Sequence, residues 1–421
     1  MDEVLPADAD ITPERLAQFI NIAESGWIEE QLKAYEAFRK AYSPEGIWSH
    51  RPPEMSPLIP LIYWSSREPY IPTNEAPVGY WIGEPKSILG RLFAELMDFH
   101  DYWTGLPYER GLKNLRYCLR SPMRFASFEH ELRTAATYKM RTPYEVEPCF
   151  LDARSNRGQP DIVLRKEGQH FNVQCKVMDP SASSTMPYEL FQYLSGRLGR
   201  VCQDYNVHSI LSVSLKGGCA KTVSKRDVEV IIGRVRKALD RGITTIDSLE
   251  FSKGEFTCTH RLGAIPLSER STHLLTMFTG DYLFREVRNL PSLLQSEGLT
   301  SICQVSGVRI PPFENYVYPN AVEAAESAPK SNPLIICIHL YPPMDVHGLA
   351  TNKITHDKLN ADFHKFFDKN RHVCLVLVSS YAQQAFWAGG NKQTIATPAW
   401  EIESQHWQGE RPDYYPYGVN Y

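Results

Sequence analysis

Hydrophobic and polar positions alternate most clearly in one short stretch, residues 161–178. Along residues 171–177 the odd positions are apolar, and the even positions are Asn172, Gln174 and Lys176. Successive side chains of a strand point to opposite faces, so one face is apolar and the other is polar. Gly168 predicts a tight turn before this strand. We therefore predict an antiparallel hairpin of strands 161–166 and 170–178, whose polar face lines a cleft or meets solvent.

Helical periodicity flanks this hairpin on both sides. Residues 121–140 repeat apolar side chains at helical spacing, at Phe125, Phe128, Leu132, Ala135 and Ala136. Residues 187–206 carry a second apolar stripe, and residues 209–215 are predicted to form a strand. With a further strand at about residues 144–151, the predicted order from 121 to 215 is helix, strand, strand, strand, helix, strand.

The flanking regions are predicted to contain further helices and strands. Residues 1–43 are predicted to be helical, with Thr12 as N-cap and Pro13 in the first turn, and so are residues 87–115. The Pro- and aromatic-rich segment 44–86 is predicted to be an ordered, irregular connection. We also expect a basic helix at 224–241, apolar strands at 333–342 and 372–381, and a helix at 358–368 between those strands. This last unit either extends the central sheet or forms a separate α/β domain.

The polar face of the hairpin carries candidate metal chemistry. Mg²⁺ prefers carboxylate, carbonyl and water oxygens. Asp161 would be the central ligand, the amide oxygen of Gln174 a second, and the backbone carbonyl of Cys175 or Val177 a third. Such a metal would polarise a phosphate and activate a water, while Lys176 would hold that water or stabilise charge on the phosphate. The alternative is that Asp161 caps a strand and Gln174 and Lys176 form a solvated face.

A carboxylate upstream adds to this set. Glu131 lies at the edge of the apolar face of helix 121–140, where an acid needs a partner or a metal. Glu129 lies four residues before Arg133, a spacing that predicts a surface ion pair. Glu131 is therefore the better candidate ligand.

The segment 121–215 resembles the PD-(D/E)xK nuclease superfamily, whose core is αβββαβ. Pro160-Asp161 matches the PD element, Gln174-Cys175-Lys176 matches (D/E)xK, and Glu131 matches the helical glutamate. Gln174 departs from the usual acid, as in the Mrr-like restriction-endonuclease branch. The resemblance covers 95 of 421 residues. It implies a Mg²⁺-dependent DNA endonuclease of restriction or phage-defence type, with Mn²⁺ able to substitute.

This resemblance predicts an α/β protein in three parts. Residues 1–115 would be a mostly helical N-terminal region, residues 116–255 the restriction-endonuclease-like core, and residues 256–421 an α/β C-terminal region that could extend the nuclease sheet. The aromatic N-terminal and C-terminal segments carry more apolar surface than one nuclease core needs, so we expect one of them to form a homodimer interface, although the same aromatics could pack within the monomer. The alternative function is a non-catalytic nucleic-acid-binding or scaffold protein on a degenerate nuclease fold.

Charge distribution supports a nucleic-acid partner. The formal net charge is −4, yet residues 111–241 carry 22 basic and 13 acidic residues. Phosphate binding needs such a local basic excess, although charge clusters are commonly only solvated faces. DNA is the expected partner and RNA stays open. The candidate contacts are Arg124, Arg133, Arg197, Arg200, Lys225 and Arg234.

Other features limit the remaining possibilities. Hydrophobic residues make up 43% and charged residues 22% of the chain, which is ordinary for a globular protein. No apolar run reaches the ~20 residues of a membrane helix, and the N-terminus lacks signal-peptide character. Nine scattered cysteines without a CxxC pair argue against structural zinc and suit a reducing cytoplasm. Residues 216–222 do not satisfy a phosphate-loop pattern, and the histidine pairs 339/347 and 356/364 lack accompanying ligands.

Overall fold

The computed structural model is described for most of the chain between residues 11 and 412. The described residues are 11–42, 52, 54–66, 85–153, 158–178, scattered positions from 190 to 205, 207–215, 223–241, 245–253, 256–266, 273–280, 299–308, 314–340, 353–380, 384–388, 391–395, 400–410 and 412. Statements below about the structure refer to these residues.

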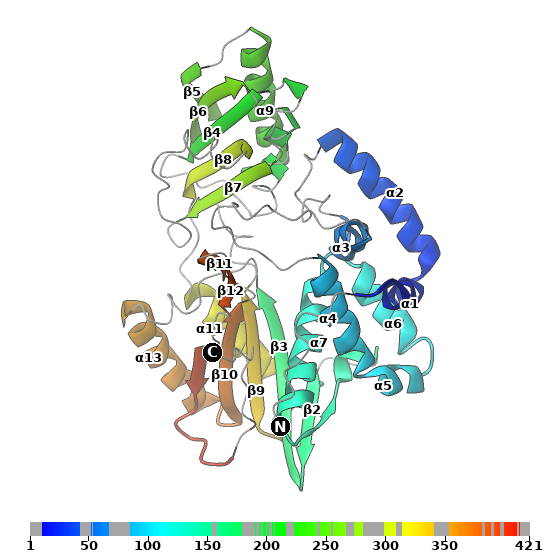
Figure 1. Ribbon diagram of the computed structural model, residues 1–421. Helices are drawn as coiled ribbons and strands as arrows, with labels where there is room; N and C mark the ends of the chain where they lie inside the picture. Colours follow the sequence, from blue (N-terminus) through cyan, green and yellow to red (C-terminus); the bar gives the residue numbers. More distant parts are fainter. Residues whose placement is uncertain are drawn as a thin grey trace.

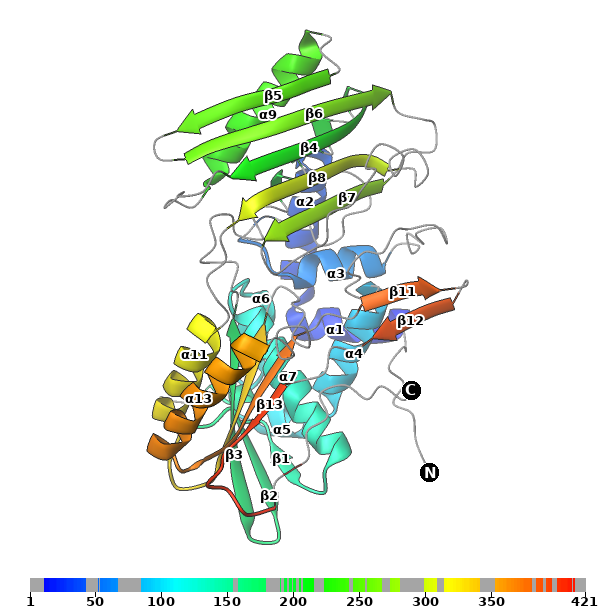
Figure 2. The ribbon, with the colours of Figure 1, turned by 90° about the vertical axis from the view of Figure 1, so that its left-hand side faces the viewer.

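A six-stranded mixed sheet with helices on both faces organises the part of the chain that carries the candidate site (Figures 1 and 2). Its strand order is β1-β2-β3-β9-β10-β13. The strands are β1 (Glu145–Glu147), β2 (Ile162–Lys166), β3 (Gln169–Met178), β9 (Leu334–Leu340), β10 (Val373–Ser380) and β13 (Trp400–Glu403). Strands β3, β9 and β10 run parallel to one another, while β1–β2, β2–β3 and β10–β13 are antiparallel pairs. The chain is therefore of the α/β class.

The β2–β3 hairpin forms as its alternating pattern predicts. Lys166 pairs with Gln169, and Glu167 and Gly168 between them have φ values of 43° and 84°. Two positive φ values in a two-residue loop match the right-handed twist of the strands. On β3, the side chains of Phe171, Val173 and Cys175 enter the same core as helix α7 (Arg124–Arg141). The apolar face of this strand was therefore predicted correctly.

Strands β9 and β10 extend this sheet, one of the two arrangements that the sequence left open. Every residue of β9 is buried, as expected for a parallel strand covered on both faces. Helices α11 (Glu314–Ser327) and α13 (Lys353–Lys369) cover one face. Helix α7 (Arg124–Arg141) covers the other, as Figure 2 shows with the sheet seen nearly edge-on.

The N-terminal region is helical, as predicted, and packs behind α7. Its helices are α1 (Pro13–Ala23), α2 (Ser25–Tyr42), α3 (Leu58–Ser65), α4 (Pro85–Met97), α5 (His100–Gly105) and α6 (Leu112–Arg120). Thr12 caps α1 by accepting a hydrogen bond from the Arg15 amide. Helix α3 lies in a segment that we expected to be irregular. Its prolines fall at the first turn, where no intrahelical N–H is needed, and its apolar residues are buried on all sides.

A second sheet interrupts the expected core. Its order is β5-β6-β4-β8-β7, and both views show it beyond one end of the six-stranded sheet (Figures 1 and 2). Its strands are β4 (Val207–Leu215), β5 (Thr245–Lys253), β6 (Phe256–Pro266), β7 (His273–Gly280) and β8 (Leu299–Val308), and α9 (Lys225–Asp240) lies beside them. Ser224 and Asp227 form the capping box of α9.

This second sheet corrects the predicted element order. Strand 209–215 was expected to complete the core sheet, but it pairs with β6 and β8 instead. The helix and strand that follow β3 in the six-stranded sheet are α11 and β9, which come after the inserted segment. The expected boundary at residue 255 falls between β5 and β6, which are hydrogen-bonded neighbours. Element order alone does not reveal which sheet a strand joins, because a helix precedes both β4 and β9.

The described aromatic residues near the two ends pack within one chain. Phe19 and Tyr35 are buried in the core that contains α7. The Trp407 ring lies 5.8 Å from that of Phe171 on β3, and β11 (Gln384–Ala388) pairs with β12 (Asn391–Ile395). For these residues the structure shows the packing within the monomer that the sequence left open, and the homodimer stays a prediction.

Candidate functional site

Asp161 lies at the start of β2 and is bound directly to β3. One of its carboxylate oxygens, Oδ2, accepts hydrogen bonds from the side-chain amide of Gln174 at 2.6 Å and from the backbone amide of Cys175 at 2.7 Å. The Asp161 amide donates to the carbonyl of Val173 at 3.0 Å. Asp161 and Gln174 are thus brought together, as the hairpin pattern predicts.

The backbone of β3 leaves carbonyl groups near this carboxylate. In a strand, the N–H and C=O of one residue point to the same edge. The Cys175 N–H points to Asp161, so its carbonyl faces that edge too. Pairing of β3 with β2 reaches only Val173, opposite Ile162. The Cys175 carbonyl therefore lies past the end of the β2 ladder, beside Asp161.

Glu131 approaches the same site from α7. Its side chain is buried, and its Oε2 lies 3.6 Å from Nη2 of Arg124 at the start of the helix. Burial and the charge of Asp161 raise the pKa of Glu131 to about 8, although Arg124 and Lys176 act in the opposite direction. Burial likewise raises the pKa of Asp161 to about 6, opposed by the Cys175 amide and by Lys176. Asp161, Arg124 and Lys176 thus lie near enough to Glu131 for their charges to affect its pKa.

Lys176 follows on the polar face of β3. Its Nζ donates to Glu323 Oε1 at 2.8 Å. Glu323 belongs to α11, and no sequence motif pointed to it. Its position beside Lys176 depends on the packing of α11 against β3, which joins segments almost 150 residues apart.

The oxygen atoms at this site suit a hard divalent cation. Among the described residues, Glu131 Oε2 and Gln174 Oε1 are buried and have no hydrogen-bond partner. No group of three or more His, Cys, Asp or Glu side chains suited to a metal occurs in the described part of the chain. Mg²⁺, however, is commonly held by one or two carboxylates and keeps several waters. Asp161, Glu131, the Gln174 amide oxygen and the Cys175 carbonyl therefore fit such an ion.

Two of the predicted nucleic-acid contacts are corrected by their burial. Arg133 is only 5% exposed; its Nη2 donates to Glu129 at 2.8 Å, and its Nε lies 3.6 Å from Glu95. The expected Glu129–Arg133 pair thus forms, but it is not on the surface. Arg197 is also buried and donates two hydrogen bonds of 2.9 Å to Glu229 on α9. Neither guanidinium is placed to contact phosphate.

The other four predicted contacts remain accessible. Arg124 is partly exposed beside Glu131, and Arg234 on α9 is partly exposed. Arg200 forms an exposed ion pair with Asp204 at 3.0 Å. Exposed Lys225 lies 4.9 Å from the centre of the Tyr193 ring. All except Arg124 are on the helices beside the second sheet rather than at the candidate site.

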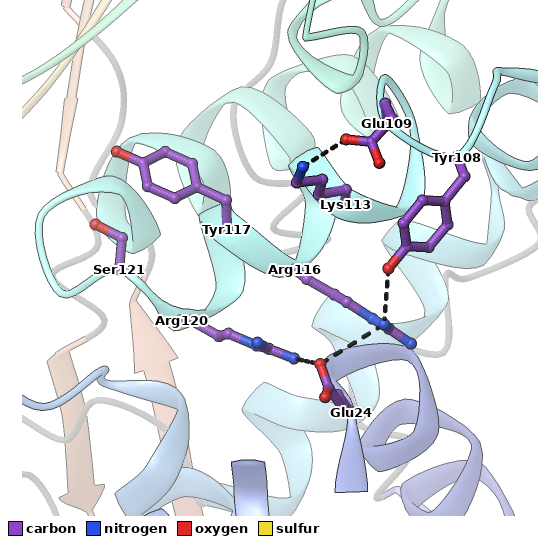
Figure 3. A pocket seen from close by; sticks show the side chains of 8 residues that line it. All are labelled: Glu24, Tyr108, Glu109, Lys113, Arg116, Tyr117, Arg120 and Ser121. Carbon is purple, nitrogen blue, oxygen red and sulfur yellow. Dashed lines mark hydrogen bonds and ion pairs between the residues drawn. The ribbon is translucent and has the colours of Figure 1, made fainter. Parts of the chain in front are cut away.

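A separate pocket of about 600 Å³ lies between α6 and the end of α1 (Figure 3). Arg116 and Arg120 point to Glu24, and both also donate to backbone carbonyls at the end of α1. Lys113 pairs with Glu109 at 2.5 Å. The three cations are thus engaged by two carboxylates and by helix-end carbonyls. The residues that line the pocket therefore connect α6 to the end of α1, which explains the pocket as a packing feature.

Comparison of the chain with protein-family models, curated proteins and solved structures finds no match. Function must therefore be inferred from the site itself. No helix in the described part of the chain has the length and apolar character required to cross a membrane.

Proposed function

We propose that this protein is a metal-dependent nuclease that hydrolyses phosphodiester bonds of DNA. The observations that support the proposal are two. Asp161 is hydrogen-bonded to Gln174 and Cys175 on β3. Buried Glu131 on α7 lies near enough to Asp161 and Lys176 for their charges to affect its pKa, which is raised. Burying two acids together costs stability. A divalent cation offsets that cost and gives the arrangement a chemical purpose.

Each residue of the site has a separate role in the proposed hydrolysis. Asp161, Glu131, the Gln174 amide oxygen and the Cys175 carbonyl would hold Mg²⁺ or Mn²⁺, which when bound polarises a phosphate and lowers the pKa of a water. Lys176 donates hydrogen bonds to a phosphate oxygen or to the attacking water. Arg124, near Glu131, adds positive charge where the phosphate enters.

Proton equilibria at the site predict pH-dependent cation binding. Ligand carboxyl groups must release their protons before they bind a metal. Because the pKa values of Asp161 and Glu131 are raised to about 6 and about 8, cation affinity should rise as the pH increases from 6 to 8.

A cleavage assay tests the proposal. Wild-type protein is incubated with plasmid, linear, branched and single-stranded DNA and with RNA, with and without Mg²⁺ or Mn²⁺. Asp161→Ala and Lys176→Ala should each abolish cleavage with the fold intact, whereas Gln174→Glu should retain or raise it. Glu145→Gln, at an exposed position on β1, is the control and should cleave normally. Unchanged cleavage by Asp161→Ala would refute the assignment.

The second candidate is a non-catalytic nucleic-acid-binding or scaffold protein. Two observations favour it: Gln174 brings no charge, and Lys176 is engaged by Glu323. The same assay separates the two, because this candidate binds nucleic acid but cleaves no substrate with any metal.

A further inference from the structure

Lys176 interacts both with the buried carboxyl groups and with an exposed one. Its charge opposes the rise in the pKa values of buried Asp161 and Glu131. Its ammonium group donates a hydrogen bond to exposed Glu323 at 2.8 Å. The Lys176 side chain is 21% exposed and that of Glu323 is 68% exposed. The Glu323 carboxylate therefore lies on the solvent side of Lys176, from which a polyanion would approach.

The packing of α11 brings Glu323 to this position. Residues Ala321, Ala324 and Ala325 are fully buried in the core beneath α11. Short side chains allow a close approach between packed elements. Glu323 is exposed between these alanines, so its carboxylate extends along the edge of the interface to reach β3.

The pair also spans an interruption in the chain. Strand β3 ends at Met178, two residues after Lys176, and α11 begins at Glu314. The second sheet is formed by the chain between these two elements. Lys176 and Glu323 thus connect the two elements of the six-stranded sheet unit that flank the insertion.

We propose that Glu323 is a positioning residue that holds Lys176 until a phosphodiester displaces the Glu323 carboxylate. The Glu323 carboxylate therefore competes with the substrate phosphate for Lys176. The proposal rests on the proposed function. An exposed ion pair is weak, and a phosphate offers the ammonium group an equivalent charge-assisted hydrogen bond. Displacement is therefore easy, but the carboxylate must be removed from the position that the phosphate takes.

Binding of a fluorescent DNA oligonucleotide, measured by anisotropy without Mg²⁺ or Mn²⁺, tests this role. Glu323→Gln should lower Kd about fivefold, which corresponds to about 1 kcal/mol. The matched control is Glu326→Gln, which removes the same charge from an exposed position one turn along the same helix and should change Kd less than about twofold, as expected for a solvent-screened charge that forms no ion pair with Lys176. In the Lys176→Ala background, Glu323→Gln should have no effect beyond that of the control.

Steady-state cleavage adds a second readout. KM should fall in Glu323→Gln while kcat stays unchanged, because both proteins present the same Lys176 once the phosphate is bound. A purely structural role would leave both constants unchanged or lower kcat.

The outcomes separate the two proposals. Equal effects of Glu323→Gln and Glu326→Gln, or an effect that persists without Lys176, would overturn the role of Glu323 while leaving hydrolysis intact. If wild-type protein binds the oligonucleotide and shows the Lys176-dependent effect but never cleaves, the nuclease proposal fails and the role of Glu323 stands. If it binds no oligonucleotide, the role of Glu323 is overturned, and the cleavage assay with Mg²⁺ or Mn²⁺ alone decides the nuclease proposal.

Discussion

Replacement of Glu131 by glutamine should stabilise this protein, and increasingly so at higher pH. Glutamine keeps the shape of the side chain but carries no charge to bury. In the folded protein, burial and Asp161 raise the pKa of Glu131 from 4.5 to about 8. Between these two values the folded state retains a proton that the unfolded state has released, so stability decreases as the pH rises.

The structure sets the size of this effect. A pH of 7 is about 2.5 units above the ordinary pKa that Glu131 has in the unfolded state, and each unit corresponds to about 1.4 kcal/mol. Burial of Glu131 therefore lowers the free energy of unfolding at pH 7 by about 3 kcal/mol. Glu131→Gln should recover about 1–3 kcal/mol at pH 7–8, since the new amide loses the attraction of Arg124, and almost nothing at pH 4.

Urea unfolding at pH 4, 5, 6, 7 and 8 measures the difference. The free-energy gap between Glu131→Gln and wild type should widen with pH, whereas the gap for the exposed control Glu326→Gln should stay flat. Mg²⁺ should stabilise wild type by about 1.4 kcal/mol at ten times its Kd, more strongly at pH 8 than at pH 6. The variant should lose most of this response together with cleavage.

Two results would refute this reasoning. If Glu131→Gln destabilises the protein at every pH, the Glu131 carboxylate stabilises the folded state through its ion pair with Arg124 more than its burial costs. If the gap between variant and wild type does not depend on pH, the folded-state pKa of Glu131 is not raised. A Mg²⁺ response retained in full by the variant would remove Glu131 from the set of ligands.

Two further predictions concern other parts of the molecule. The buried imidazoles of His130 and His339 stack 5.0 Å apart, and burial lowers the pKa of His130 to about 4; the contribution of His130 to stability should therefore fall as the pH drops from 6.5 towards 4, opposite in sign to that of Glu131, and urea unfolding should show a shallower acid limb in His130→Gln. DNA affinity should fall steeply with salt, and Arg200→Glu with Lys225→Glu should weaken it and reduce the salt slope, whereas charge reversal of the exposed acid Glu30 on α2 should leave the slope unchanged; a salt-independent affinity would favour a protein-binding scaffold.

The sequence by itself determined the local elements around the site. Strict alternation at residues 171–177 and the turn at Gly168 specified the β2–β3 hairpin, because a shift by one residue would exchange the apolar and polar faces. That register places Asp161 opposite Gln174. The helical spacing of Phe128 and Leu132 predicted α7 and one apolar face, whereas the structure buries every residue from His130 to Tyr138, Glu131 included. Short-range periodicity is sufficient for the hairpin and for the existence of the helix.

Only the tertiary structure decided which distant segments complete the site. Strands β4 and β9 both follow a helix, so element order does not show which one pairs with β3. The contact of Glu323 with Lys176 depends on that choice. Burial of Arg133 beside Glu95 likewise follows from the packing of α4 on α7. Periodicity records how each residue faces its own element, whereas these contacts depend on how whole elements pack against one another.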